Sequence, residues 1–353
     1  MLGCKFGWAV AGAALLTVLG TGTAMAKPKP EPQWSIVIHG GAGVIERDKL
    51  SKEAEAAYRA SLSAALEAGR GALEEGRSAL DVVELVVRRL EDDPLFNAGV
   101  GAVFTAEGRN ELDASIMDGR TRAAGAVAGV TRVRNPISAA RAVMEKSPHV
   151  FLAGEGAEAF AAAEGLAMVA PGYFYTQRRW DGLVQALQQR GWPIPAKPEG
   201  APAGRAAIGA PLDEHKFGTV GVVVRDRKGD LAAGTSTGGV TAKRWGRIGD
   251  SPVLGAGTYA QNGVCAVSAT GSGEFFIRAA VAHAICARVA LRREPVQAAA
   301  DAVIKQELAA MGGDGGVIAV GPRGETVWSF NTPGMYRARQ RAGEAPEIGI
   351  FSD

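Results

Sequence analysis

Residues Lys216 to Gly239 read KFGTVGVVVRDRKGDLAAGTSTGG. Four valines crowd positions 220–224, turn-forming residues follow at 226–229, and 231–237 resemble a returning strand. This pattern predicts a β-hairpin. The Gly218-Thr219 pair joins a long irregular segment directly to the first strand of that hairpin, with no room for a connecting loop.

Two interpretations of Thr219 are open at this point. It can be an ordinary strand threonine, since threonine is common in strands. Alternatively, the Gly218–Thr219 peptide bond is cut, and Thr219 becomes an N-terminus whose hydroxyl is a nucleophile and whose α-amine is the general base. An α-amine titrates at about 7.7–8.0, so modest desolvation leaves it largely neutral. Glycine at position 218 also tolerates a strained backbone that exposes the carbonyl to attack.

Composition narrows the class of protein. The chain has 353 residues, of which 47% are hydrophobic, enough to bury a large core in one or two domains. The net charge is +2, without a long basic or acidic block, so nucleic acids and anionic membranes are not expected partners. The remaining expectation is a globular protein that acts on a small molecule.

Residues 1–26 are predicted to be a signal peptide. Lys5 supplies a positive charge, residues 9–22 are apolar or small, and Ala24-Met25-Ala26 is a typical cleavage site. A retained membrane anchor is the alternative, but the apolar run is shorter than the ~20 residues that a span needs. We therefore expect an exported protein, in the periplasm, with no membrane attachment after the signal is removed.

Removing the signal peptide also removes Cys4 and leaves Cys265 and Cys286. An exported protein with two cysteines is not a disulfide scaffold. The sequence does not show whether the two pair, and we expect buried free thiols.

The rest of the chain alternates helical and strand patterns with glycine-rich turns. Turns are expected at 39–43 and 269–273, and the Pro-, Gly- and Ala-rich residues 190–217 read as a flexible linker that ends at the proposed cut. Expected helices cover 51–68, with a stop at Gly69-Arg70-Gly71, and 78–90, 137–145, 154–164 and 274–290; expected strands cover 36–38, 111–117, 123–130, 264–268, 316–320, 326–330 and 348–351.

Three stretches carry polar groups suited to a ligand. Arg247 and Asp250 can hold the carboxylate and the ammonium of an amino acid, or they can be a solvated surface pair. The turn at 269–273 places a hydroxyl and backbone N–H groups before a helix, which suits an oxyanion. The loop after Leu90 can offer carbonyl oxygens to a hard cation.

From Ile36 to its C-terminal end, the chain resembles the plant-type L-asparaginases, or isoaspartyl peptidases, of the N-terminal-nucleophile hydrolase superfamily. The ordered set of motifs is specific, although each one is weak alone. The motifs are HGGAG at 39–43, PLFNAGVGAVFT at 94–105, ELDASIMDG at 111–119, NPISAARAVMEKSPHV at 135–150, GTVG at 218–221, TSTGG at 235–239, RIGD at 247–250, ATGSGE at 269–274 and FNTPGMYR at 330–337.

The resemblance implies an α+β fold, an αββα four-layer sandwich in which two stacked antiparallel sheets lie between helical layers. It also implies self-cleavage at Gly218–Thr219. The α subunit would be residues 27–218 and the β subunit residues 219–353, both from one folding unit, and two such pairs would form an (αβ)₂ assembly.

The resemblance further assigns roles to single residues. Thr219 would attack the side-chain carbonyl of an L-aspartyl group in L-asparagine or a β-aspartyl (isoaspartyl) peptide, with Thr237 hydrogen-bonded nearby. Arg247, Asp250 and the Gly273 carbonyl would bind the aspartyl α-groups, and Thr270 and Gly271 would form the oxyanion hole. No cofactor is expected for catalysis. A structural sodium ion would bind the backbone carbonyls of Leu90, Glu91, Asp93, Phe96, Ala98 and Val100.

Three rival interpretations remain. Residues 234–238 match the G-x-S-x-G elbow of serine hydrolases, although that motif needs a helix after the turn. An exported amino-acid binding protein would use Arg247 and Asp250 without any cleavage. An aspartylglucosaminidase would share the chemistry and act on N-glycosylated asparagine.

Overall fold

The computed structural model describes residues 1–5, 7, 34–201 and 218–352. Most of the expected signal peptide and most of the expected linker lie outside these residues. The chain divides into two units, residues 1–31 and 32–353, and every helix and strand described below belongs to the second. None of the helices in the described ranges combines the length and the apolar character that crossing a membrane requires.

The predicted hairpin lies in the middle of a large sheet. Strand β5 (Val220–Arg225) pairs antiparallel with β6 (Leu231–Thr237), which confirms the prediction. The order of the eight strands is β12-β11-β1-β5-β6-β2-β3-β4, and only β3 and β4 pair in parallel. The other strands are β1 (Ser35–Gly43), β2 (Leu112–Asp118), β3 (Ala124–Val130), β4 (Phe151–Ala153), β11 (Gly334–Arg341) and β12 (Glu347–Phe351).

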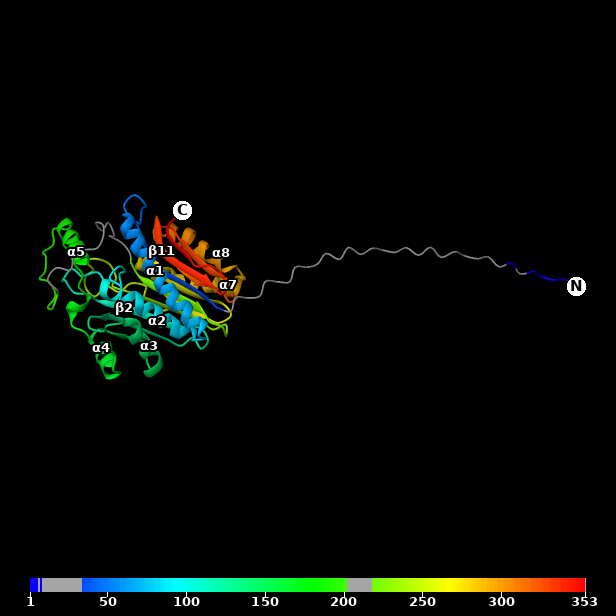
Figure 1. Ribbon diagram of the computed structural model, residues 1–353, viewed down its shortest axis with the longest axis horizontal. Coiled ribbons are helices and arrows are strands. Elements are labelled where there is room, and N and C mark those ends of the chain that lie inside the picture. The colour runs from blue at the N-terminus through cyan, green and yellow to red at the C-terminus, as the bar shows by residue number, and fades with distance from the viewer. Residues whose placement is uncertain (6, 8–33, 202–217, 353) are drawn as a thin grey trace. The chain divides into compact units, whose positions relative to one another are not determined.

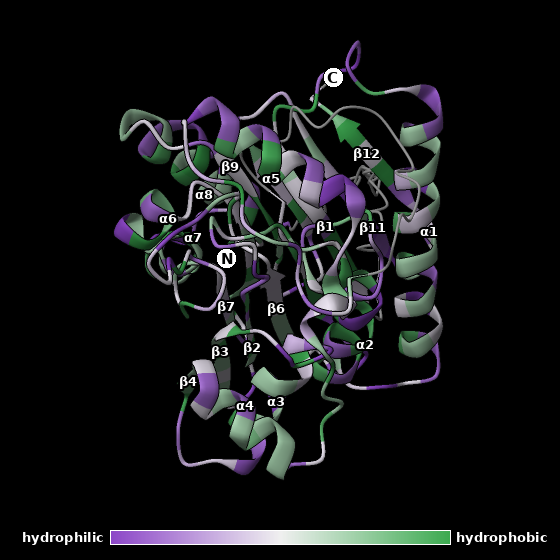
Figure 2. Cartoon of the chain, turned by 90° about the vertical axis from the view of Figure 1, so that its left-hand side faces the viewer, coloured by the Kyte–Doolittle hydropathy of each residue, from purple (hydrophilic) through white to green (hydrophobic). Residues whose placement is uncertain are grey.

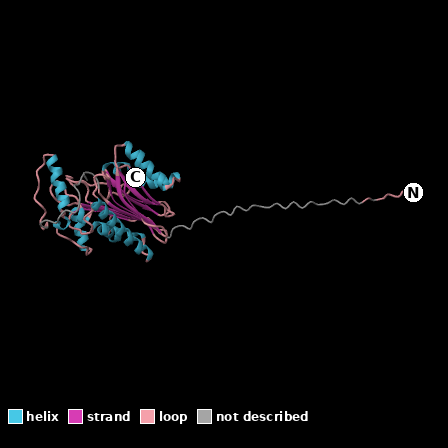
Figure 3. Ribbon diagram, turned by 45° about the horizontal axis from the view of Figure 1, so that its top comes forward, coloured by secondary structure: helices cyan, strands magenta, loops and turns pink. Residues whose placement is uncertain are grey.

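A second sheet of four strands has the order β10-β9-β8-β7 and is antiparallel throughout. Its strands are β7 (Thr258–Gln261), β8 (Cys265–Gly271), β9 (Gly315–Val320) and β10 (Thr326–Phe330). The strands of the two sheets lie together, and the helices lie around them (Figure 3).

The helices of the folded unit lie between Lys52 and Leu308. The long helices α1 and α2 run beside one another, and α7 and α8 lie together elsewhere in the unit (Figure 1). The helices are α1 (Lys52–Glu74), α2 (Ala79–Glu91), α3 (Pro136–Lys146), α4 (Gly154–Ala163), α5 (Gln177–Gln189), α6 (Gly273–Ala279), α7 (Val281–Arg292) and α8 (Val296–Asp301), with short turns η1 (Gly99–Gly101), η2 (Pro171–Phe174) and the π-helical η3 (Ala302–Leu308).

The hairpin is buried on both faces because successive side chains of a strand point to opposite sides. Val222 and Val224 belong to a core that includes Leu62 of α1 and Val83 of α2. Val223 faces the other way, into a core shared with strands of the four-stranded sheet. Helix α1 carries hydrophobic and hydrophilic residues interleaved along its length, as expected for a helix with one buried side (Figure 2).

The predicted stop of the first helix at Gly69-Arg70-Gly71 is wrong, since α1 continues to Glu74. A Cβ atom at Gly69 would lie 2.4 Å from Ile36 Cδ1 and 3.1 Å from Val86 Cγ2. The glycine therefore allows α1 to approach the sheet and α2 closely, and it does not end the helix. Its cost in helix propensity is about 1 kcal/mol, which burial of the surrounding side chains offsets.

Two further expectations about turns are wrong. Residues 39–43 are not a turn but the end of β1, where the pairing with β11 shifts between His39 and Gly41. Residues 269–271 likewise belong to β8. In both cases a neighbouring strand supplies backbone partners that hold the glycine-rich segment extended.

The predicted helix at 274–290 is two helices, α6 and α7. They are separated by Ala280, which has φ 47° in the left-handed region and interrupts the helical path. The other predicted helices and strands are present, with ends that differ by a few residues.

The expectation of free thiols is also wrong. Cys265 and Cys286 form a disulfide, with a Cα–Cα distance of 5.6 Å. Cys265 begins β8 and Cys286 lies on α7, and both side chains belong to the core between this helix and the four-stranded sheet. Packing of α7 on β8 therefore brings the two sulfur atoms together.

Breaking this disulfide should lower stability measurably. The bond closes a loop with a sequence separation of 21 residues, and the chain-entropy model gives a loss of about 3 kcal/mol in the free energy of unfolding. The measurement is chemical unfolding of a Cys265→Ser/Cys286→Ser double variant beside the oxidised protein. Reductant should destabilise the parent protein alone; equal sensitivity of both proteins to reductant would contradict the assignment.

Candidate active site

Thr219 lies immediately before β5 and is 7% exposed. The hairpin pairs Val220 with Ser236, which brings Thr219 opposite Thr237 at the end of β6. The Thr219 hydroxyl donates to Thr237 Oγ1 at 3.1 Å. Thr237 Oγ1 in turn donates to the Gly218 carbonyl at 3.1 Å and accepts from the Gly239 N–H at 3.0 Å. The nucleophile candidate, its predicted partner and the bond predicted to be cut therefore meet in one place.

Asn97 is a site residue that the sequence reasoning missed. Its Nδ2 donates to the Gly218 carbonyl at 2.7 Å and to the Gly239 carbonyl at 2.8 Å. Its Oδ1 accepts from the Val103 N–H at 2.9 Å, which fixes the orientation of the amide. The Gly218 carbonyl thus accepts two hydrogen bonds, one from Asn97 and one from Thr237. One feature of the sequence could have identified it: Asn97 is a polar residue within the apolar, glycine-rich run of 94–105.

His39 is a second residue with a role that was missed. Its Nδ1 lies 2.9 Å from the Thr219 carbonyl and its Nε2 lies 2.9 Å from Ser268 Oγ. Complete burial lowers the pKa of His39 to about 3, so the ring is neutral. A carbonyl can only accept, so Nδ1 carries the proton and Nε2 accepts from Ser268. Ser268 is also 2.7 Å from Thr235 Oγ1, and this buried network links the carbonyl of Thr219 to β8.

A small hollow opens beside Thr219. It brings together six of the predicted residues, which lie on separate elements and loops. Its lining is Gly218, Thr219, Thr237, Gly239, Val240, Arg247, Gly249, Asp250, Ser251 and Gly271. Gly273 lies just outside, since a Cβ there would be 2.9 Å from Arg247 Nη2 and 2.9 Å from Asp250 Oδ1. Thr270 is fully buried in β8, and its hydroxyl accepts from the Ala42 N–H at 3.4 Å.

Arg247 and Asp250 are not a solvated surface pair. Asp250 is 4% exposed, and its Oδ2 has no hydrogen-bond partner among the described residues. Burial raises the pKa of Asp250 to about 7, and the positive charge of Arg247 partly opposes that rise. Arg247 itself forms a two-bond ion pair with Glu274. A buried carboxylate with one oxygen left without a hydrogen bond, on the wall of a hollow, is suited to a cationic group of a ligand.

The loop after α2 folds so that backbone carbonyls crowd two glycines. A Cβ at Gly99 would lie 2.1 Å from the Glu91 carbonyl oxygen, and one at Gly101 would lie 2.0 Å from that of Phe96. The described residues contain no group of three or more His, Cys, Asp or Glu side chains able to hold a metal ion. Uncharged carbonyl oxygens are hard ligands, so the donors that this loop provides fit a hard cation of low charge.

The serine-elbow interpretation does not fit the geometry. Ser236 lies within strand β6, is fully buried, and donates to Glu91 Oε1 at 2.7 Å. The residues after β6 form no helix before β7. A nucleophile elbow requires an exposed serine on a turn between a strand and a helix, and Ser236 meets neither condition.

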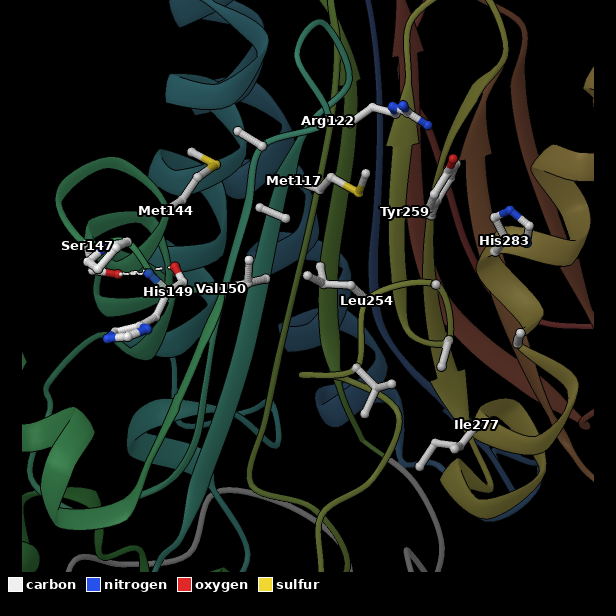
Figure 4. Close-up of a pocket in the computed structure, with 17 residues that line it drawn as sticks. Met117, Arg122, Met144, Ser147, His149, Val150, Leu254, Tyr259, Ile277 and His283 are labelled. Atoms are coloured by element: carbon white, nitrogen blue, oxygen red, sulfur yellow. Dashed lines mark hydrogen bonds between the residues drawn. The ribbon is translucent and has the colours of Figure 1, made fainter.

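A larger hollow lies elsewhere on the folded unit (Figure 4). Its wall combines apolar side chains with Arg122, His149 and His283, and Met117 and Tyr259 point into the space between them. None of the predicted site residues contributes to it. Those predicted site residues that line a hollow are therefore found at the smaller one, beside Thr219.

Comparison with known proteins gives a consistent set of relatives. A family model described as asparaginase matches residues 32–350. The isoaspartyl peptidase of Salmonella typhimurium is 50% identical over 322 residues, which cover 90% of this chain and 98% of that protein. The isoaspartyl peptidase of Escherichia coli is 51% identical over 319 residues, with coverages of 90% and 96%. The human isoaspartyl peptidase/L-asparaginase is 39% identical over 319 residues, again with coverages of 90% and 96%.

Proposed function

The chain belongs to the asparaginase family, and from this membership and the geometry around Thr219 we propose that it is a self-processing threonine hydrolase of β-aspartyl peptides and L-asparagine. The observation that carries the proposal is the convergence of the Thr219 hydroxyl, Thr237 and the Gly218 carbonyl beside the buried Asp250, whose Oδ2 has no hydrogen-bond partner among the described residues. The product common to both substrates is L-aspartate.

Self-cleavage would begin with attack of Thr219 Oγ on the Gly218 carbonyl carbon. The carbonyl oxygen gains negative charge, and the Asn97 amide and the Thr237 hydroxyl already donate to it. The C–N bond then breaks, the acyl group moves to Oγ as an ester, and the hydroxyl proton ends on the freed nitrogen, which becomes the α-amine of Thr219. Hydrolysis of the ester by water completes an α subunit, 27–218, and a β subunit, 219–353.

Substrate hydrolysis would reuse the same hydroxyl. Thr219 Oγ attacks the side-chain carbonyl of the bound aspartyl group, and the new α-amine accepts the hydroxyl proton. Thr270 and the Gly271 N–H would hold the resulting oxyanion, and a donor of this kind contributes about 3–4 kcal/mol to the transition state. Ammonia or an amino-acid amine leaves, and water releases L-aspartate from the ester.

Substrate recognition would rest on the aspartyl half. Arg247 binds the α-carboxylate through paired N–H groups, and Asp250 with the Gly273 carbonyl binds the α-ammonium. Asp250 supports this role because it is buried and its Oδ2 has no hydrogen-bond partner among the described residues of the uncut chain. The leaving group makes few of these contacts, so both amides and isopeptides are expected substrates.

Four broader features belong to the same proposal. The fold would be an αββα four-layer sandwich of the N-terminal-nucleophile type, and two processed chains would assemble as (αβ)₂. Three cores support the layered arrangement: one containing side chains of α1 and α2, one containing side chains of both sheets, and one containing side chains of α7 and α8.

Export to the periplasm is supported by the Cys265–Cys286 disulfide, since such bonds persist in oxidising compartments. Backbone carbonyls of the loop after α2 would hold a structural sodium ion through Leu90, Glu91, Asp93, Phe96, Ala98 and Val100.

Activity should fall as the pH drops through about 7. The raised pKa of Asp250 means that this carboxyl is protonated below that pH and then cannot balance a substrate ammonium. The measurement is the pH profile of kcat/KM, which reports groups of the free enzyme. The α-amine of Thr219 titrates in the same range, so Asp250→Asn serves as the control. A step near pH 7 that survives in this variant would contradict the assignment to Asp250.

The test of the proposed function combines intact mass with turnover. The expected result is two fragments, the second beginning at Thr219, and release of aspartate from L-asparagine and from β-aspartyl-leucine. Preferential turnover of N-glycosylated asparagine would instead favour the aspartylglucosaminidase alternative. A single uncut mass that binds amino acids without turnover would favour a binding protein.

A further inference from the structure

Arg247 can form two separate two-bond contacts with carboxylates. A guanidinium group has one edge made by Nε and one Nη and another made by the two Nη atoms, and each edge matches a carboxylate. Glu274 occupies the first edge, with Arg247 Nε to Oε1 at 2.9 Å and Nη2 to Oε2 at 3.0 Å. Among the described residues no other group accepts a hydrogen bond from this guanidinium. The edge formed by Nη1 and Nη2 is therefore left for a ligand.

Two glycines lie against the guanidinium group of Arg247. A Cβ at Gly249 would lie 2.8 Å from Nη1, and a Cβ at Gly273 would lie 2.9 Å from Nη2. Any other residue at these positions would place its Cβ atom against this guanidinium group. Arg247, Gly249 and Asp250 also line the hollow beside Thr219. The unoccupied edge is thus kept clear of side chains where a substrate carboxylate would approach.

The exposures of the two partners show which one faces solvent. The Glu274 side chain is 61% exposed and the Arg247 side chain is 19% exposed. The hydrogen bonds from Arg247 lower the pKa of Glu274, so this carboxylate stays charged when it holds the guanidinium. An exposed ion pair adds little stability, typically below about 1 kcal/mol, so its main effect here is on the orientation of Arg247.

We propose that Glu274 is a positioning residue. It holds Arg247 by the edge formed by Nε and Nη2 and thereby presents the edge formed by Nη1 and Nη2 to the α-carboxylate of the substrate. This inference rests on the proposed function, because it assigns that carboxylate to Arg247. Without Glu274 the long arginine side chain would regain rotamer freedom, and part of the binding free energy would be spent on ordering it again.

The experiment compares two competitive inhibitors in the processed enzyme. L-Aspartate carries the α-carboxylate, whereas β-alanine keeps the amine and the distal carboxylate and lacks it. Glu274→Gln should weaken inhibition by L-aspartate and raise KM for L-asparagine by about fivefold, the equivalent of one exposed pair, with kcat within about twofold. Inhibition by β-alanine and the rate of self-cleavage should not change.

Glu294→Gln is the matched control variant. Glu294 also pairs with arginines, Arg288 and Arg292, but it contacts none of the site residues. It should leave both inhibitors and both kinetic constants unchanged.

Each other outcome has a distinct meaning. Unchanged L-aspartate inhibition in Glu274→Gln, or equal weakening of L-aspartate and β-alanine, would overturn the positioning role. Tighter L-aspartate inhibition would overturn it too, because Glu274 would then compete with the substrate for Arg247. Failure of the parent enzyme to hydrolyse L-asparagine or to bind L-aspartate would overturn the proposed function, and this inference with it.

Discussion

A Thr219→Ala variant should remain a single chain and should have no measurable hydrolase activity. The substitution removes the hydroxyl that is proposed to attack the Gly218 carbonyl. This hydroxyl lies 3.1 Å from Thr237 Oγ1, which donates to that carbonyl. Without cleavage no α-amine is formed, so both the nucleophile and its base are lost. Loss of a nucleophile in a comparable catalytic unit lowers kcat by about 10⁶-fold.

The measurement is intact mass together with aspartate release from L-asparagine. Thr219→Ser is the control, because it keeps a hydroxyl and an α-amine and should still be cut, although more slowly. Thermal unfolding of the alanine variant should resemble that of the uncut parent, since Thr219 contributes one hydroxyl contact. An uncut variant that still hydrolyses L-asparagine would show that the nucleophile lies elsewhere.

Asn97→Ala should slow self-cleavage by about 10²–10³-fold, the usual effect of losing one oxyanion donor. Asn97 Nδ2 makes the shorter of the two hydrogen bonds to the Gly218 carbonyl, 2.7 Å against 3.1 Å from Thr237. As negative charge develops on that oxygen, this hydrogen bond strengthens, so its loss affects the transition state more than the uncut chain. The measurement is the rate at which the precursor mass disappears after purification or refolding.

Asn110→Ala is a matched control for packing and stability. Asn110 is also buried, and its Nδ2 donates to the carbonyls of Ala102 and Val103 at 2.9 and 3.0 Å. Both variants lose two amide-to-carbonyl hydrogen bonds, and Asn97→Ala also loses the one from the Val103 N–H. Both should be destabilised by roughly 1–3 kcal/mol because buried polar groups lose partners. Only Asn97→Ala should process slowly. Similar processing rates in the two variants would contradict an oxyanion role for Asn97.

Local sequence patterns predicted the elements that are stabilised mainly by interactions between residues close in the sequence. The valine run and the turn at 226–229 specify the hairpin of β5 and β6, because β-branched side chains and turn residues act within a few positions. The predicted helix at 78–90 is α2, and Ser78 caps it, because its hydroxyl accepts from the Asp81 N–H. Ordered motifs then identified Thr219, Thr237, Arg247, Asp250 and Gly271, which the structure gathers around one hollow.

Elements whose stability comes from distant partners were missed or misread. Strand β11 is held between β1 and β12, and its sequence has no clear alternation of its own. Gly69 looked like a helix stop because glycine has low helix propensity, yet its lack of a side chain is what the contact with Ile36 requires. A single-residue propensity contains no information about which surface the residue will meet.

The sequence by itself determined the hairpin, the order of the motifs and the chemistry of the residues at the site. Only the tertiary structure decided which groups control that chemistry: Asn97 reaches the Gly218 carbonyl across 121 positions, and His39 reaches the Thr219 carbonyl across 180. It also decided that Glu274 holds one edge of Arg247 and that Cys265 pairs with Cys286. The physical reason is that hydrogen bonds and burial depend on distance in space, and the packing of the two sheets and their helices sets these distances.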